Sequence, residues 1–177
     1  MSALSEQMDV FLRFCVPYTV MFILFIFNMV FFYTPLSTTI EVPFVVMMIY
    51  YWAIYRPMLI PPSLVFVVGV CLDSMSGFPM GLSSFIFLIL RQIVSDQRLF
   101  LTGQPFLVIW LGYAIVSGAF VILQWGVFGL IHLQWTPIAP VFSTFVAGVF
   151  LFPAIGLILN LSHKVLPILP DQYSAVK

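Results

Sequence analysis

The chain has 177 residues, of which 63% are hydrophobic and 7% are charged, and its formal net charge is zero. A soluble globular domain carries about 25% charged residues, so a surface this poor in charge predicts that lipid, rather than water, surrounds the protein. Because basic and acidic residues balance, the chain lacks the basic field that nucleic-acid-binding proteins use, and we expect no nucleic-acid partner.

Apolar runs divide the chain into six candidate membrane helices joined by short polar turns. They cover residues 14–33, 42–55, 61 to 74 or 75, 80–94, 105–130 and 137–161. A helix rises about 1.5 Å per residue, so about 20 apolar residues cross a hydrocarbon core of about 30 Å. The second, third and fourth runs are shorter than that, so we expect them to borrow flanking residues or to lie in thinned bilayer. The prediction is an all-α transmembrane domain of six helices over residues 14–161, between an N-terminal segment, 1–13, and a tail, 162–177.

The basic residues predict the orientation of these helices. Cytoplasmic loops of membrane proteins carry an excess of lysine and arginine. With six crossings and a cytoplasmic N-terminus, every basic residue falls on the cytoplasmic side: Arg13, Arg56, Arg91, Arg98, Lys164 and Lys177. We therefore expect a multi-pass membrane protein with both termini in the cytoplasm.

Polar and backbone-shaping residues concentrate between residues 52 and 92, where Asp73 follows the apolar run 64–72. An ionisable group at that depth is costly unless it faces protein or water, so Asp73 is a candidate functional residue. Spacings of three and four residues predict one helix face made of Pro62, Phe66, Gly69, Asp73 and Gly77. Gly69 on this face would admit a close neighbour. Two interpretations stay open: a polar site against a helix or ligand, or a carboxylate that caps the next segment or binds the turn 74–77.

Other residues in the apolar runs predict helix packing. A second close-packing face in the last run is predicted by Gly148, Phe152, Gly156 and Asn160. Asn28 and Gln124 predict hydrogen bonds between helices. Cys15 and Cys71 are expected near opposite membrane faces, beyond the roughly 4.4–6.8 Å that separates the Cα atoms of a disulfide, and we expect both as buried thiols. The tryptophans lie toward the ends of the runs, as interfacial anchors do.

Catalytic and cofactor motifs are missing from the sequence. The chain contains no Gly-rich phosphate loop, no His/Cys metal cluster and no nucleophile elbow. Asp73 has no positioned acid, base or nucleophile beside it in the sequence. We therefore expect a protein without enzymatic activity and without a cofactor.

The central stretch resembles the family of the rod shape-determining protein MreD. That family carries an apolar segment with tryptophan, an inner turn with proline, and then a pattern of the form F-x-x-G-x-x-x-D-x-x-x-G followed by a further glycine. The matching residues are Trp52, Pro57, Phe66, Gly69, Asp73, Gly77 and Gly81. The tract S-G-F-P-M-G over residues 76–81 is the most characteristic part, and Arg56 directly before the proline is a local variation.

The resemblance implies a non-enzymatic subunit of the bacterial rod (elongation) complex, a multi-pass protein of the inner membrane that maintains cell shape. The implied partners are an MreC-like bitopic membrane protein, a glycosyltransferase/transpeptidase pair that builds lateral cell wall and, indirectly, the MreB filament. The implied fold is similar to the substrate-binding subunits of energy-coupling-factor transporters. That similarity gives the alternative function, a small-molecule-binding subunit of a membrane transporter.

Overall fold

The computed structural model describes residues 2–32, 42–76, 79–133 and 137–165, and these ranges contain helices and no strand. The helices are α1 (Ser2–Phe32), α2 (Phe44–Tyr55), α3 (Pro62–Ser76), α4 (Leu82–Asp96), α5 (Arg98–Thr102), α6 (Phe106–His132) and α7 (Ile138–Val165), with a 3₁₀ turn, η2, at Pro57–Leu59. The all-α fold class is therefore confirmed. Each of the six predicted runs corresponds to one of the longer helices.

The helix boundaries differ from the predicted ones in three places. α1 begins at Ser2, so the expected boundary between an N-terminal segment and the first span lies inside one continuous helix. α5 forms within the stretch 95–104 that was expected to be a polar loop. α7 continues to Val165, past the predicted end of the last run at residue 161. α1 and α7 extend beyond their apolar runs, because hydropathy marks the apolar part of a helix and not its ends, whereas α5 is a separate helix of five residues.

Two helices in the described part of the chain, α6 and α7, are long and apolar enough to cross a membrane. Only 28% and 22% of the residues in their most apolar windows are buried in the protein. The core helix of a soluble protein would be mostly buried, so these two helices present apolar surface outward. Shorter apolar helices cover Cys15–Val30, Phe44–Tyr55 and Pro62–Met75.

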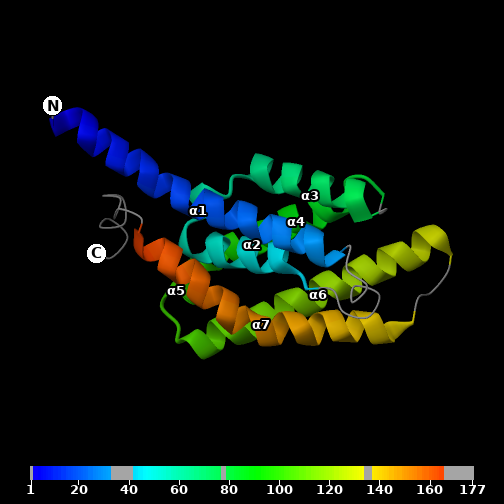
Figure 1. Ribbon diagram of the computed structural model, residues 1–177. Helices are drawn as coiled ribbons and strands as arrows, with labels where there is room; N and C mark the ends of the chain where they lie inside the picture. The colour runs from blue at the N-terminus through cyan, green and yellow to red at the C-terminus, as the bar shows by residue number, and fades with distance from the viewer. Residues whose placement is uncertain (1, 33–41, 77–78, 134–136, 166–177) are drawn as a thin grey trace.

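The long helices alternate in direction along the chain (Figure 1). α1, α3 and α6 run one way and α2, α4 and α7 run back, so the start of α1 and the end of α7 lie toward the same end of the bundle. Arg56 follows α2 and Arg98 begins α5, so both lie toward that end, and Arg91 is in the last two turns of α4. The α3–α4 hairpin packs on one side of α2, and the longer α6–α7 hairpin lies on the other (Figure 1).

α2 is the centre of the fold. Every residue from Phe44 to Ile54 is buried, with 6% exposure or less, and α1, α4, α5, α6 and α7 all contact this helix. A helix that is apolar on all sides is stable when it is enclosed, and the surrounding helices of the protein enclose α2. Trp52 is fully buried in α2, so its expectation as an interfacial anchor is wrong. The other helices surround α2 and keep Trp52 away from an interface.

The two ends of α2 are fixed by backbone geometry and one side-chain contact. The Asn28 amide of α1 donates to the Val42 carbonyl at 2.9 Å, so its partner is the segment just before α2 and not, as expected, another helix. At the other end Arg56 has φ −149° and ψ 75°, outside the helical region. A residue before proline is pushed out of helical geometry, so Pro57 ends α2 and begins the η2 turn.

Small residues let α6 and α7 approach the centre. The Tyr50 hydroxyl of α2 donates to the Ile109 carbonyl of α6 at 2.9 Å. A Cβ atom at Gly112 would lie 2.5 Å from that hydroxyl, and one at Gly148 would lie 3.2 Å from Pro43. The predicted close-packing face of the last run is therefore confirmed at Gly148 and at the buried Phe152, whereas Asn160 is exposed. A Cβ at Gly156 would meet nothing nearer than 3.9 Å, so that position is less crowded.

The cysteines contradict their predicted burial, because Cys15 and Cys71 are both free and exposed. They lie on the outward faces of α1 and α3, where no helix of the described ranges covers them. An apolar run permits either face for a small thiol, so hydropathy alone could not place them.

Candidate functional site

Asp73 joins the end of α3 to the beginning of α4. Its carboxylate accepts the Gly81 N–H at 2.8 Å through Oδ2 and the Ser83 N–H at 3.1 Å through both oxygens. Asp73 is 1% exposed. The first N–H groups of a helix have no partner within that helix, and they attract negative charge. The carboxylate of α3 therefore caps α4, which confirms the capping interpretation with donors on the far side of the turn.

Gly69 brings the two helices into backbone contact one turn before Asp73. A Cβ atom at this position would lie 2.4 Å from the Ser84 Cα and 2.5 Å from the Ser84 Oγ. The Ser84 hydroxyl donates to the Phe66 carbonyl at 3.0 Å. The close approach predicted for Gly69 is confirmed, and its partner is the start of α4. We call the set Gly69, Asp73, Gly81, Ser83 and Ser84 the α3–α4 joint.

Gly81 gives the joint its sharp entry into α4. Its φ is +96°, in the left-handed region that glycine adopts without steric cost. The Gly81 carbonyl accepts the Phe85 N–H at 2.9 Å, which begins the α4 hydrogen-bond ladder. A side chain at residue 81 would strain this backbone even though the space around it is open. Gly81 thus presents its N–H to Asp73 while it turns the chain into α4.

Arg91 fixes the other end of α4. Its Nε donates to the Ile60 carbonyl at 2.7 Å and its Nη2 to the Pro57 carbonyl at 3.4 Å. These two carbonyls belong to the turn between α2 and α3. Arg91 was expected only to mark the membrane interface, but its guanidinium also ties α4 to the segment that precedes α3. The α3–α4 hairpin is therefore held by side-chain contacts at both ends of α4.

The structure divides the residues of the sequence motif into two groups. Gly69, Asp73 and Gly81 meet at the α3–α4 joint. Trp52, Arg56 and Pro57 lie at the opposite end of the hairpin, at the end of α2 and in the turn that follows, and Phe66 lies between the two groups on α3. Gly77 lies outside the described residues.

Phe66 departs from the predicted helix face. Its side chain is 48% exposed, and only its backbone carbonyl reaches the joint. Pro62 is exposed as well, whereas Val65 is 0% exposed. The buried face of α3 is therefore Val65, Gly69 and Asp73, so Gly69 and Asp73 lie on the predicted face and Val65 takes the place of Phe66. Both stripes satisfy helical spacing, and contact with α4 decides between them.

Ser83 and Ser84 are the residues of the joint that the sequence interpretation missed. Ser83 is 4% exposed and Ser84 is 0% exposed. Two adjacent small polar residues directly after a turn glycine, at the start of an apolar helix, are the signal that could have identified them. The expected donors for Asp73 were the Ser74 hydroxyl and the turn 74–77, but the Ser74 hydroxyl donates to the Val70 carbonyl at 2.8 Å.

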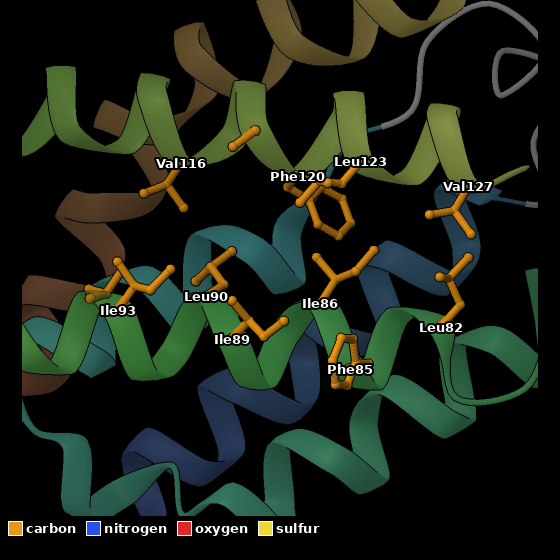
Figure 2. Close-up of a pocket in the computed structure, with 12 residues that line it drawn as sticks. Leu82, Phe85, Ile86, Ile89, Leu90, Ile93, Val116, Phe120, Leu123 and Val127 are labelled. Atoms are coloured by element: carbon orange, nitrogen blue, oxygen red, sulfur yellow. The ribbon is translucent and has the colours of Figure 1, made fainter.

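The opposite side of α4 faces α6 across an open apolar groove of about 240 Å³. Figure 2 shows Ile86, Leu90 and Ile93 on α4 facing Val116 and Phe120 on α6. All twelve lining residues are apolar, and they extend along α4 from residue 82 to residue 94 and along α6 from residue 116 to residue 127. We call this surface the α4/α6 groove.

The joint and the groove lie on two sides of one helix. Hydrogen bonds and close packing occupy the side of α4 that faces α3, and the groove side carries aliphatic and aromatic surface. This arrangement suits a helix that is held on one side and meets another apolar body on the other. Comparisons with protein-family models, with curated proteins and with solved structures found no match to this chain.

Proposed function

We propose that the chain is a six-span subunit of the bacterial rod (elongation) complex in the inner membrane, which supports lateral cell-wall synthesis by helix–helix contact and not by catalysis. The proposal combines the motif resemblance with the α4/α6 groove, which is the observation that carries it. The groove receives one transmembrane helix of an MreC-like bitopic partner. Contact with the wall-synthesis pair and with MreB follows through that partner.

The length and chemistry of the groove favour a membrane helix as its occupant. Its α4 wall covers residues 82–94, or about 18 Å of helix, which is more than half of a hydrocarbon core of about 30 Å. A partner helix gains packing contacts along this whole length. Apolar lining with no polar side chain matches a span that carries small and aliphatic residues at its contact face. Exposed aromatic surface such as Phe85, at 65%, would otherwise face lipid.

The arrangement of the helices supports the six-span part of the proposal. Outward apolar surface on α6 and α7 fits a lipid environment. Alternating helix directions place Arg56 and Arg98 toward one end of the bundle, as the positive-inside rule expects for cytoplasmic loops. In this orientation the α3–α4 joint lies at the periplasmic side. α2–α4 are short spans within a locally thinned bilayer.

Site-specific photocrosslinking in cells tests the proposed contact. A photoreactive amino acid at Phe85 should capture the MreC-like partner, identified by mass spectrometry and by loss of the product when that partner is depleted. Phe150 on α7 is the matched control, because it is also an exposed phenylalanine, with 76% exposure, and it lies outside the groove. Depletion of the chain itself should convert rod-shaped cells into rounded ones.

Three results would contradict the proposal. The first is retained rod shape after full depletion. The second is equal capture of the partner at Phe85 and Phe150, because it would show proximity without use of the groove. The third is capture of lipid alone at Phe85 while the partner crosslinks elsewhere, which would assign the groove to an acyl chain.

A further inference from the structure

A second, smaller cavity lies between α2, α6 and α7, away from the groove and the joint. Its volume is about 110 Å³. Tyr51 and Tyr55 contribute from the last turns of α2, Phe106 from the first turn of α6, and Gly156 and Asn160 from the second half of α7. It therefore lies toward the end of the bundle where Arg56 follows α2. On the proposed topology this is the depth of the inner-leaflet headgroups.

Tyr51 is the buried polar group of this cavity. The residue is 5% exposed, and its ring contacts the rings of Trp52 and Tyr55, with centroids 5.5 and 4.6 Å away. Among the described residues, nothing forms a hydrogen bond with the Tyr51 hydroxyl. The Tyr50 hydroxyl next to it in sequence does have a partner, the Ile109 carbonyl at 2.9 Å. A buried tyrosine usually satisfies its hydroxyl, so the Tyr51 hydroxyl needs a partner that enters the cavity.

The lining restricts the chemistry of that partner. The polar groups are two phenols and the Asn160 amide, with no ionised side chain, so an ion would lose its hydration without a charged partner. Phenol and amide groups both donate and accept hydrogen bonds, as an alcohol does. A cavity of about 150 Å³ holds benzene, with six carbon atoms. By proportion, about 110 Å³ holds roughly four or five non-hydrogen atoms.

We infer that this cavity binds the vicinal diol of a glycerol-type group, whose two carbons and two hydroxyl oxygens match the roughly four or five non-hydrogen atoms that the cavity holds. Its hydroxyl groups bond to Tyr51 and Asn160, and its C–H groups pack on Phe106 and Phe152. The group can come from a free polyol or from the glycerol headgroup of a lipid such as phosphatidylglycerol. The mouth carries Leu157, 66% exposed, and Phe106, 54% exposed, so it opens on apolar surface that lipid can reach. The assignment to a lipid headgroup rests on the proposed location in a membrane. It does not depend on the proposed role in the rod complex.

Native mass spectrometry of the purified full chain tests this inference. The protein is exchanged into nanodiscs of phosphatidylglycerol or of phosphatidylethanolamine with the same acyl chains, released, and scored for retained lipid. We expect retention of phosphatidylglycerol over phosphatidylethanolamine by wild type. Tyr51→Phe removes one hydrogen bond and should weaken retention about three- to tenfold. Asn160→Leu should have a similar effect, and Asn160 is exposed, so folding is not at risk.

Tyr113→Phe is the matched control, because it removes the hydroxyl of another buried tyrosine, which contacts Tyr50 and Phe152 but does not line the cavity. It should retain phosphatidylglycerol as wild type does. Displacement of the lipid by excess free glycerol would assign the site to the free polyol, and resistance to glycerol would assign it to the lipid headgroup. Equal retention of both lipids with no effect of glycerol would overturn the inference. An equal loss of phosphatidylglycerol retention in Tyr51→Phe and in Tyr113→Phe would overturn the inference as well.

Discussion

Replacement of Asp73 provides the strongest test of the α3–α4 joint, because one carboxylate serves two N–H groups, a buried one on Ser83 and a half-buried one on Gly81. Asp73→Leu leaves both N–H groups without an acceptor. An unsatisfied buried group costs about 1–3 kcal/mol, so the free energy of unfolding should fall by about 1–3 kcal/mol through Ser83, and by a smaller amount through Gly81, whose N–H water can reach. The loss is largest at the start of α4, since that helix also loses the negative charge at its N-terminus.

Asp73→Asn should be milder, and the geometry gives the reason. An amide oxygen at the position of Oδ2 still accepts the Gly81 N–H, now 2.8 Å away, and the Ser83 N–H, now 3.1 Å away. The amide nitrogen then takes the position of Oδ1, where it faces the Ser83 donor. We expect a loss of about 1–2 kcal/mol, the difference between a charged and a neutral hydrogen bond.

The assay is reversible unfolding in mixed detergent micelles, paired with membrane abundance and complementation of rod shape. Asp96→Asn is the matched control, because Asp96 is exposed at the other end of α4 and its change should cost less than about 0.5 kcal/mol. Asp73→Leu with wild-type stability would refute the capping role. Asp73→Asn that is made at normal levels yet is completely inactive would instead identify Asp73 as a proton-handling or ligand-binding group.

Two further predictions concern the contacts on either side of Asp73. Gly69→Ala should lower the free energy of unfolding by about 1–3 kcal/mol, because its Cβ meets the Ser84 backbone at 2.4 Å, whereas Gly126→Ala, in open space within α6, should stabilise by about 0.5–1 kcal/mol. Equal effects of the two substitutions in the same micelle assay would contradict the close contact. Arg91→Gln should cost about 1.5–3 kcal/mol and increase proteolysis of the turn between α2 and α3, while Arg98→Gln on the exposed start of α5 should be neutral. Unchanged proteolysis in Arg91→Gln would show that the guanidinium does not hold this turn.

The presence of the six long helices and the end of α2 at a proline were predictable, because run length and proline position act locally. Pro57 ended α2 at Arg56 as its steric effect on the preceding residue requires. The environment of each helix was not predictable in the same way. α2 and the apolar window of α6 have similar composition. The α2 side chains are enclosed by other helices, whereas most residues of the α6 window are not buried. Hydropathy measures whether a side chain tolerates an apolar surrounding, and lipid and protein interior both provide one.

The candidate site was predictable where a residue has one possible use and unpredictable where several remain. Gly69 was identified because a glycine among large apolar residues signals close approach. For Asp73 the sequence left open the next segment and the nearest turn, and only the structure shows that the carboxylate reaches past the turn to Gly81 and Ser83. Phe66 was placed one residue off the buried face for the same reason. Each error concerns which neighbour is present, and that information lies in the pairing of α3 with α4.

α4 connects the two features that the proposed function needs. Ser84 and Arg91, seven residues apart, lie on the side that is fixed to α3 and its preceding turn. Phe85 and Ile89, four residues apart, line the groove. A helix with contacts at one end only could still rotate and change which side chains face a partner. Hydrogen bonds at both ends fix the rotation of α4 about its axis. Polar residues outside the α4/α6 groove therefore determine which apolar side chains face into it.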